Sequence, residues 1–133
     1  MKWIKDGKNL ITGTAKGEIF KWEAQPKFLF ANQNSVHGKA TVQAICITNY
    51  EKFVVSADKE GFIVYSNIKL AQKNKFQAHG SLPIRDLSLS NSSLKLLSCS
   101  DDSTAKVFDF ATSKEELCFT DHRSDVRSCD WHP

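Results

Sequence analysis

The stretch LKLLSCSDDSTAKVF, residues 94–108, decides the fold of this chain. An apolar run ends at Ser98, a polar turn follows around Ser103, and a second β-forming run ends at Phe108. Alternating β-formers on both sides of a short polar segment are typical of a strand, a tight turn and a second strand. The same pattern occurs twice more, in KNLITGTAKGEIFKW (8–22) and EKFVVSADKEGFIVYS (51–66).

Equivalent positions in these stretches recur with a period of 42 to 44 residues. The recurring sets are Thr12, Ser56 and Ser98; Gly17, Gly61 and Ser103; Trp22, Ser66 and Phe108; and His37, His79 and His122. A repeat of this length that holds four short strands is typical of one blade of a β-propeller. No segment has the 3.6-residue periodicity of a sustained helix.

The repeat therefore predicts an all-β fold: a propeller fragment of about three four-stranded antiparallel blades plus one inner strand of the next. Blade one would span about residues 1–32, blade two 42–78 and blade three 84–120, with a fourth blade beginning in 126–133. The predicted strands are Lys2–Ile4, Asn9–Thr14, Glu18–Glu23, Lys27–Ala31, Val42–Thr48, Lys52–Ala57, Phe62–Asn67, Lys73–Ala78, Ile84–Ser90, Lys95–Ser100, Thr104–Asp109, Glu115–Thr120 and Val126–Trp131.

One set of polar residues lies where WD repeats hold a hydrogen-bonded His, Ser/Thr, Asp and Trp network within a blade. In blade three this set is His79, Ser98, Asp102 and Phe108, and Phe108 lacks the indole donor of the usual tryptophan. The imidazole, hydroxyl and carboxylate would satisfy one another across the strands, so that no buried polar group is left unpaired.

In blade two the corresponding set is less complete. It keeps His37 and Ser56, but Glu60 stands in the place of the aspartate and Ser66 in the place of the tryptophan. The spacing therefore predicts a weaker network in blade two than in blade three.

Beyond the generic repeat, the chain resembles the WD-repeat subunit of the pre-mRNA cleavage and polyadenylation specificity factor. The resemblance covers essentially the whole chain in order and is carried by WIKDGK (3–8), LITG (10–13), GE (17–18) before Trp22, ADKEGF (57–62), FQAH (76–79), IR (84–85), CSDD (99–102), FDF (108–110), EE (115–116), DVR (125–127) and DWHP (130–133). The FQAH–IR and DVR–DWHP pairs are the more discriminating, because CSDD is common to many WD repeats.

The resemblance implies a non-enzymatic nuclear scaffold that helps recognise the AAUAAA signal in pre-mRNA. Its implied partners are pre-mRNA, a large multi-propeller subunit and a zinc-finger subunit. The family's RNA-contacting segment matches Lys27, Phe28 and Phe30 here, where aromatic rings would stack on bases beside a basic side chain. The alternative is that both phenylalanines are core residues of an outer strand. The family also implies seven blades and a basic N-terminal arm, so these 133 residues are expected to be part of a longer propeller.

Charge is unevenly distributed along the chain. Residues 1–80 hold twelve lysines against six acidic residues, whereas residues 81–133 hold six basic and nine acidic residues, which gives the net charge of +3. The basic half could contact RNA phosphates, or its lysines could simply be solvated residues that protect strand edges. No apolar run reaches the length of a membrane span, and residues 1–7 lack the apolar region of a signal peptide.

The cysteines lack the spacing of a metal site. Cys46, Cys99, Cys118 and Cys129 form no Cys-x-x-Cys pair, which favours free buried thiols in a reducing compartment. We expect no metal, no cofactor and no small-molecule substrate.

Two alternatives to an RNA-processing scaffold remain open at this stage. The chain could be a WD-repeat adaptor that binds only proteins in another nuclear or cytosolic complex, because a fold does not fix a function. An enzyme would require a reading of DHRS (121–124) as part of a hydrolase triad, but no Gly-x-Ser-x-Gly elbow accompanies it. His122 is better explained as the third member of the repeating histidine set.

Overall fold

Twelve β-strands are present in the part of the chain that the structure describes. The computed structural model describes residues 1–23, 29–50 and 52–132, with the backbone alone for residues 29–32. The strands are β1 (Lys2–Trp3), β2 (Asn9–Gly13), β3 (Ile19–Glu23), β4 (Leu29–Asn34), β5 (Val42–Ile47), β6 (Phe53–Asp58), β7 (Phe62–Asn67), β8 (Gln72–Gln77), β9 (Ile84–Leu89), β10 (Lys95–Ser100), β11 (Ala105–Asp109) and β12 (Glu115–Phe119). Within the described ranges, no helix is long and apolar enough to cross a membrane.

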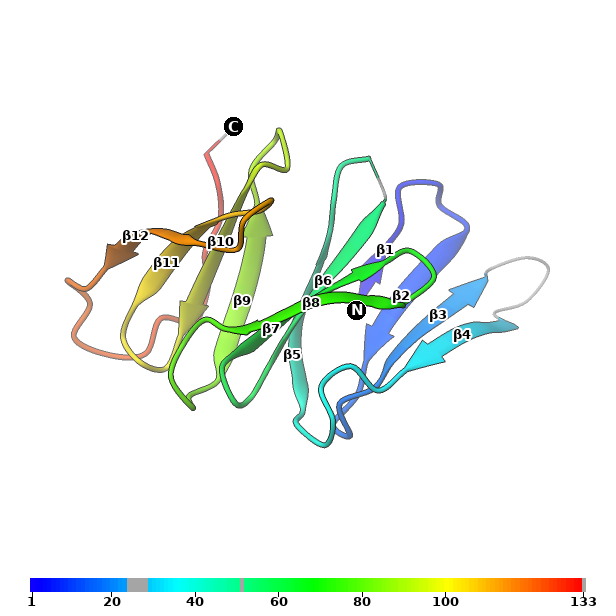
Figure 1. Ribbon diagram of the computed structural model, residues 1–133, viewed down its shortest axis with the longest axis horizontal. Helices are drawn as coiled ribbons and strands as arrows, with labels where there is room; N and C mark the ends of the chain where they lie inside the picture. Colours follow the sequence, from blue (N-terminus) through cyan, green and yellow to red (C-terminus); the bar gives the residue numbers. More distant parts are fainter. Residues whose placement is uncertain (24–28, 51, 133) are drawn as a thin grey trace.

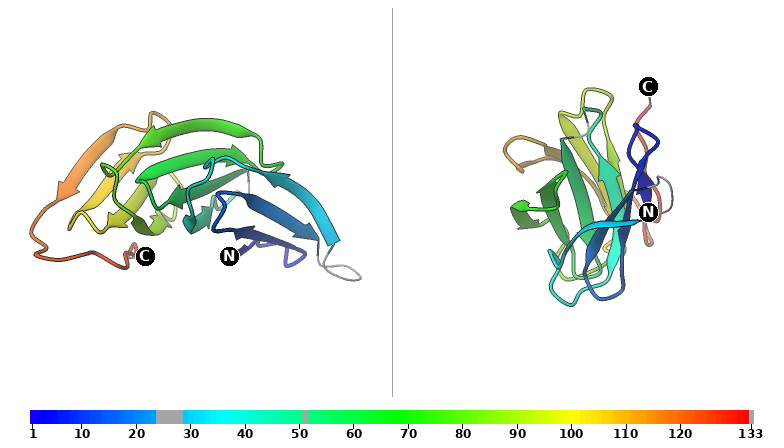
Figure 2. Two further views of the ribbon diagram at one scale, coloured as in Figure 1. Left: turned by 90° about the horizontal axis from the view of Figure 1, so that it is seen from below. Right: turned by 90° about the vertical axis from the view of Figure 1, so that its right-hand side faces the viewer.

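The strands form three separate sheets of four, each antiparallel and each in chain order (Figure 1). The sheets are β1–β4 (blade one), β5–β8 (blade two) and β9–β12 (blade three). Figure 2 shows that the blades follow one another along an arc, with both chain termini on its concave side. The predicted all-β fold of three four-stranded antiparallel blades is confirmed.

The blades are held together by apolar side chains on both faces of blade two. Side chains alternate between the two faces of a strand, so consecutive residues of β6 point to different neighbours. Val54 packs with Ile4, Ile11 and other residues toward blade one, whereas Val55 packs with Leu96 and other residues toward blade three. Both valines are fully buried. Blade two is therefore the centre of the hydrophobic core.

The turns between the second and third strands of the blades have a left-handed backbone. Gly17, Gly61 and Ser103 have φ angles of 80°, 85° and 64°. These are the three turn positions that the repeat singles out in the sequence. Glycine adopts this conformation without a steric penalty, but a serine does not, because its Cβ approaches the following carbonyl.

Replacing Ser103 with glycine is therefore expected to stabilise the protein by up to about 1 kcal/mol. The measurement is the free energy of unfolding in urea, compared with a Ser92→Gly variant in a neighbouring exposed loop. An equal or lower stability for the Ser103→Gly variant would show that the strain at this turn is already relieved.

Two predicted strands differ more from the observed structure than the others do. The outer strand of blade one continues to Asn34 rather than ending at Ala31, whereas its predicted start at Lys27 lies outside the described residues. The predicted inner strand Val126–Trp131 is not a strand. It runs beside β9 and is attached at separate points: the Val126 amide donates to the Ser100 carbonyl at 3.0 Å, and the Trp131 indole donates to the Ser88 carbonyl at 3.1 Å. A strand forms a ladder of backbone hydrogen bonds with a neighbouring strand. Residues 121–132 form no such ladder with any described residue.

Candidate functional site

A buried histidine network crosses blade three. The Nδ1 atom of His79 lies 2.8 Å from the Asp102 carboxylate, and its Nε2 atom lies 2.8 Å from the Ser98 hydroxyl. His79 and Ser98 are fully buried. The Thr104 hydroxyl, which the sequence analysis missed, donates to Asp102 at 2.6 Å and lies 3.2 Å from His79 Nδ1. These contacts tie the loop that precedes β9 to β10 and to the turn after it.

Blade two contains an equally close network, but with a different carboxylate. His37 contacts the Ser56 hydroxyl and the Asp58 carboxylate, both at 2.7 Å. The prediction that Glu60 supplies this carboxylate is wrong, because Glu60 is exposed and Asp58 is buried at the end of β6. Asp58 also accepts hydrogen bonds from the amides of Glu60 and Phe62, at 2.9 and 3.0 Å. The Asp58 side chain thus binds both His37 and the backbone of the turn that follows β6.

The fourth position of the WD pattern differs in each blade. In blade one the Trp22 indole donates to the Thr12 hydroxyl at 2.9 Å, which is the tryptophan contact typical of a WD repeat. In blade two the hydroxyl of Ser66 is buried and has no hydrogen-bond partner among the described residues. Phe108 in blade three is buried in the core between blades two and three. The Trp22 contact accordingly makes blade one the most complete at this position.

Burial disfavours the charged form of the histidine in blade three. Burial lowers the pKa of His79 below its ordinary value of 6.5, although the hydrogen bond to Asp102 acts in the opposite direction. A lowered pKa in the folded state means that the unfolded chain binds the proton more readily. The associated stability is present above about pH 6.5 and is lost as the pH falls through the folded-state value.

We therefore expect the free energy of unfolding to decrease below pH 6.5, at a rate of up to about 1.4 kcal/mol per pH unit for this group. Urea unfolding at a series of pH values between 7.5 and about 5 measures the slope. A His79→Gln variant should have a flatter profile. If wild type and variant showed the same slope, the titration of His79 would not be its source.

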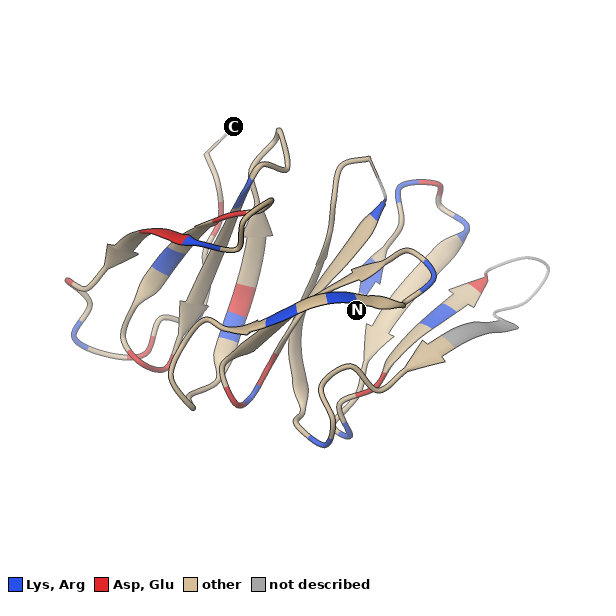
Figure 3. Cartoon of the chain, in the orientation of Figure 1, with Lys and Arg blue, Asp and Glu red and all other residues tan. Residues whose placement is uncertain are grey.

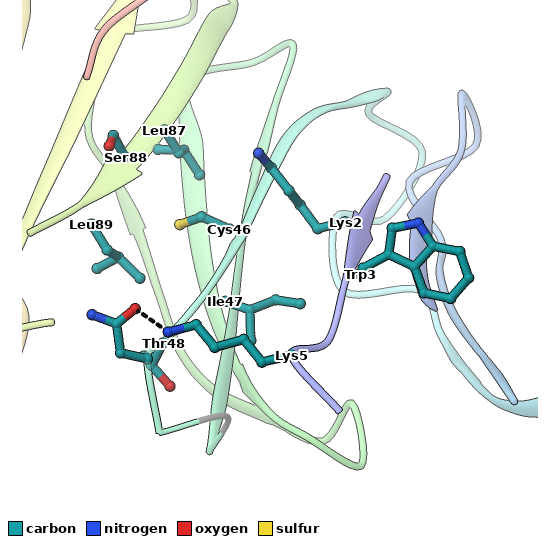
Figure 4. A pocket seen from close by; sticks show the side chains of 10 residues that line it. Lys2, Trp3, Lys5, Cys46, Ile47, Thr48, Leu87, Ser88 and Leu89 are labelled. Atoms are coloured by element: carbon teal, nitrogen blue, oxygen red, sulfur yellow. Dashed lines mark hydrogen bonds between the residues drawn. The ribbon is translucent and has the colours of Figure 1, made fainter. Parts of the chain in front are cut away.

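The inner edges of the blades form a small groove with two lysines at its margin. The groove encloses about 200 Å³ between β1, β5 and β9 (Figure 4), and its lining residues are Lys2, Trp3, Lys5, Cys46, Ile47, Thr48, Asn49, Leu87, Ser88 and Leu89. Lys2 points into the groove, and the Lys5 ammonium donates to the Asn49 side chain at 3.2 Å. Sequence reasoning missed this groove because its residues come from three different repeats.

The predicted RNA-contacting residues lie mostly outside the structural description. Lys27 and Phe28 fall in residues 24–28, which are not described, and the side chain of Phe30 is likewise outside the described set. The backbone of Phe30 lies in β4, opposite Trp22. Their role in RNA binding stays a prediction.

The charges follow the division that the sequence shows. Figure 3 shows lysines distributed over blades one and two and most of the acidic residues on blade three. On blade three, Arg85 and Asp101 form a bidentate ion pair at 2.7 and 2.5 Å. Lys95 pairs with Asp109 at 3.3 Å. The basic side chains of blade three are therefore largely engaged with its own carboxylates.

The residues considered for a hydrolase lie on the surface. Asp121, His122 and Ser124 lie exposed in the segment that follows β12, in contrast with the buried His37 and His79. Among the residues that the structure describes, no group of three or more His, Cys, Asp or Glu side chains could hold a metal ion.

The repeated blades and their buried histidine networks define a class of protein, and sequence comparison agrees. Residues 70–109 match the family described as "WD domain, G-beta repeat". A chain in the "Crystal Structure of Mitotic Checkpoint Complex" superimposes with a TM-score of 0.88 at 21% identity, over 98% of this chain and 40% of that one, which shows a common fold alone. Residues 70–109 therefore form a WD repeat, and the chain has the fold of a WD-repeat β-propeller segment.

Within that class the chain is similar to polyadenylation factor subunits, as its sequence motifs predict. It is 35% identical to "Polyadenylation factor subunit 2" of Neurospora crassa over 133 residues, which is 100% of this chain and 20% of that protein. The same-named protein of Cryptococcus neoformans is 31% identical over 127 residues, 96% of this chain and 17% of that protein. The "SIR4-interacting protein SIF2" of Saccharomyces cerevisiae is 26% identical over 145 residues, 98% of this chain and 27% of that protein. The chain thus spans about a fifth of the length of the polyadenylation factor relatives.

Proposed function

We propose that the chain is a non-catalytic scaffold segment of the machinery that forms the 3′ ends of mRNA in the nucleus. The observation that carries this proposal is the 35% identity to a polyadenylation factor subunit over all 133 residues. The match extends across all three blades. The implied partners are other subunits of the cleavage and polyadenylation specificity factor, including its multi-propeller and zinc-finger subunits.

We further propose that this segment helps to hold pre-mRNA at the AAUAAA signal. The excess of lysine in blades one and two supports contact with phosphates, and Lys2 and Lys5 border an open groove on the concave side. Lys27, Phe28 and Phe30 supply the combination of a cation and aromatic rings by which single-stranded RNA is commonly bound.

The test is RNA binding by the assembled complex, with an AAUAAA oligonucleotide and a scrambled hexamer as ligands. Phe30→Ala and Lys27→Ala should each weaken binding to AAUAAA. Base–aromatic stacking contributes about 1–3 kcal/mol, so the loss at Phe30 should be at least about five-fold. Lys114→Ala on blade three is a matched control for the loss of one exposed lysine. Unchanged affinity in the Phe28→Ala and Phe30→Ala variants would end the stacking hypothesis.

A second candidate function, a docking scaffold for proteins alone, is favoured by an apolar pocket between blades two and three. The pocket encloses about 440 Å³ and is lined by Tyr50, Phe53, Tyr65, Lys73, Asn74, Leu94, Asp109, Phe110 and Ala111. Tyr50 and Leu94 at its rim are 48% and 59% exposed, which is a large exposure for apolar side chains. Normal assembly of the complex together with no AAUAAA preference in any variant would favour this candidate.

A further inference from the structure

The apolar pocket of about 440 Å³ is built by blades two and three together, since all of its lining residues belong to these two blades. Its volume lies within the roughly 300–1,000 Å³ of pockets that bind drug-sized groups. The lining includes residues of the β5–β6, β9–β10 and β11–β12 loops, which lie at the same end of their blades because neighbouring strands are antiparallel. Neither blade could form this pocket alone.

Aromatic rings connect the pocket with the core between the two blades. Phe110 stacks on Tyr65, with ring centroids 4.6 Å apart, and meets Phe53 edge-on at 5.8 Å. Tyr65 in turn packs against Phe76 at 5.6 Å, and Phe76 against the buried Phe108 at 5.3 Å. The rings that line the pocket are therefore held in place by packing behind them, and they offer fixed apolar surface to an incoming group.

Hydrogen bonds between the blades fix the rim of the pocket. The amide of Asn49, next to Tyr50 of the rim, donates to the Ser93 hydroxyl at 2.9 Å. Near the outer strands, the Asn74 side chain donates to the Ser113 hydroxyl at 2.7 Å. Both contacts join blade two to blade three. A binding site that is already ordered loses less conformational entropy when it is occupied, which favours binding.

The rim itself is unusually apolar for a surface. Tyr50 and Leu94 lie on it and are about half exposed, and the Leu94 carbonyl accepts a hydrogen bond from the Phe110 amide at 2.9 Å, which joins this part of the rim to the aromatic lining. Exposed apolar side chains around a concave site mark contacts with other proteins. In such contacts the binding energy is concentrated where a large side chain, often aromatic, enters a pocket.

A β-bulge supplies the pocket with a cation. Tyr65 pairs with Asn74 and Ser66 pairs with Gln72, so that Lys73 is an extra residue in β8. A bulge of this kind redirects a side chain, and Lys73 lines the pocket. No acidic side chain among the described residues forms an ion pair with Lys73.

The carboxylate of the pocket, in contrast, already has partners. Asp109 lies 3.3 Å from the Lys95 ammonium and accepts hydrogen bonds from the amide and the hydroxyl of Thr112, both at 2.9 Å. The charge that remains without a partner at the pocket is therefore the positive charge of Lys73. It favours a ligand that carries a carboxylate beside its apolar group.

We propose that this pocket is a docking site for an acidic peptide segment of a partner protein. An aromatic side chain of the segment enters between blades two and three, and a neighbouring carboxylate pairs with Lys73. The inference rests on the scaffold role proposed above and names the chemistry of one partner. It does not require the chain to bind RNA.

The experiment is photo-crosslinking to the protein that carries this chain, in the absence of RNA. The probe is a synthetic peptide in which one p-benzoylphenylalanine is flanked on each side by glutamates, and the control peptide carries lysines in their place. Tyr50, Leu94 and Phe110 fall in the tryptic peptides 40–52, 86–95 and 107–114, in which mass spectrometry locates the attached probe. We expect the acidic probe to label these peptides about two- to five-fold more than the lysine probe does, as for one exposed ion pair.

Variants test the pocket and its cation separately. Ala111→Trp places a large side chain on an exposed lining residue and should reduce labelling by about ten-fold or more, because the anchor loses its pocket. Lys73→Glu should reverse the preference between the two probes. The matched control is Lys59→Glu, which makes the same charge change in the turn after β6, at the opposite end of this strand from Phe53. It should leave the labelling of the pocket peptides and the preference unchanged.

The comparison of probes on the unsubstituted protein keeps the test valid even if a variant does not fold. No labelling of the three peptides, or equal labelling by the acidic and the lysine probes, would overturn the proposal. Equal labelling by free benzophenone at the same concentration would also overturn it, since the pocket would then take a small apolar molecule without a peptide. Because the assay contains no RNA, its failure would leave the proposed role in mRNA 3′-end formation standing.

Discussion

A Gly61→Ala variant is expected to lose about 4 kcal/mol or more of folding free energy, a large part of the roughly 5–15 kcal/mol that stabilises a typical domain. A Cβ atom at position 61 would lie 1.6 Å from the His79 carbonyl oxygen and 2.8 Å from the His79 carbonyl carbon. These atoms cannot retreat easily, because the amides of Ala78 and His79 both donate to the Gly61 carbonyl, at 2.9 and 3.2 Å. The variant would therefore break the junction between the turn after β6 and the loop that carries the histidine of blade three.

The matched control is Gly38→Ala. Gly38 also has a positive φ, 60°, but a Cβ atom there would meet nothing within 4 Å. It should lose only the about 1–2 kcal/mol that a left-handed backbone costs an alanine. Urea unfolding followed by tryptophan fluorescence and circular dichroism measures both variants. Equal losses at positions 38 and 61 would contradict the close approach to His79.

An Asp58→Ala variant is expected to destabilise the protein by about 3–5 kcal/mol. The substitution removes the partner of His37 Nδ1 and the acceptor of two turn amides, and leaves these polar groups buried. Burial alone would raise the pKa of the Asp58 carboxyl, but hydrogen bonds from His37, Phe62 and Glu60 together hold it below its ordinary value. The stability it contributes is therefore complete above about pH 4 and is lost as the pH falls through the folded-state pKa.

Two further variants, at Glu60 and Asp102, test whether the loss of stability is specific to Asp58. Glu60→Ala should change the free energy of unfolding by less than about 0.5 kcal/mol, because Glu60 is exposed. Asp102→Ala in blade three should cost less than Asp58→Ala, because Asp102 is 19% exposed and the Thr104 hydroxyl remains within 3.2 Å of His79 Nδ1. If Glu60→Ala lowered the free energy of unfolding more than Asp58→Ala, then Glu60 rather than Asp58 would be the partner of His37, as the sequence spacing predicts.

Much of the fold could be predicted from the sequence because the same pattern of residues occurs in three successive repeats. Apolar runs, turn positions and histidines that recur every 42 to 44 residues define blade length. For the twelve observed strands, the described ends coincide with the predicted ones or differ by at most three residues. The positive φ of Gly17, Gly61 and Ser103 follows from the same alignment. The pattern predicts an inner strand at Val126–Trp131, but the structure has none there. Strand formation depends on a neighbouring strand as well as on β-forming residues, and the pattern reports only the residues.

The polar network of blade two shows the limit of reasoning from spacing. Alignment with Asp102 points to position 60, but the carboxylate that contacts His37 comes from position 58, at the end of β6. A carboxylate on either side of the same tight turn can reach the histidine, and sequence spacing does not distinguish between them. The groove of Lys2 and Lys5 escaped prediction for a related reason, since the blades bring together residues more than forty positions apart.

The most direct test of the proposed function is cleavage and polyadenylation of a pre-mRNA in nuclear extract depleted of the protein that carries this chain. We predict that depletion abolishes cleavage of an AAUAAA substrate and that adding back the protein restores it. Protein carrying Gly61→Ala should fail to restore cleavage, whereas the Gly38→Ala control should succeed. Normal cleavage and polyadenylation in the depleted extract would contradict a role in mRNA 3′-end formation.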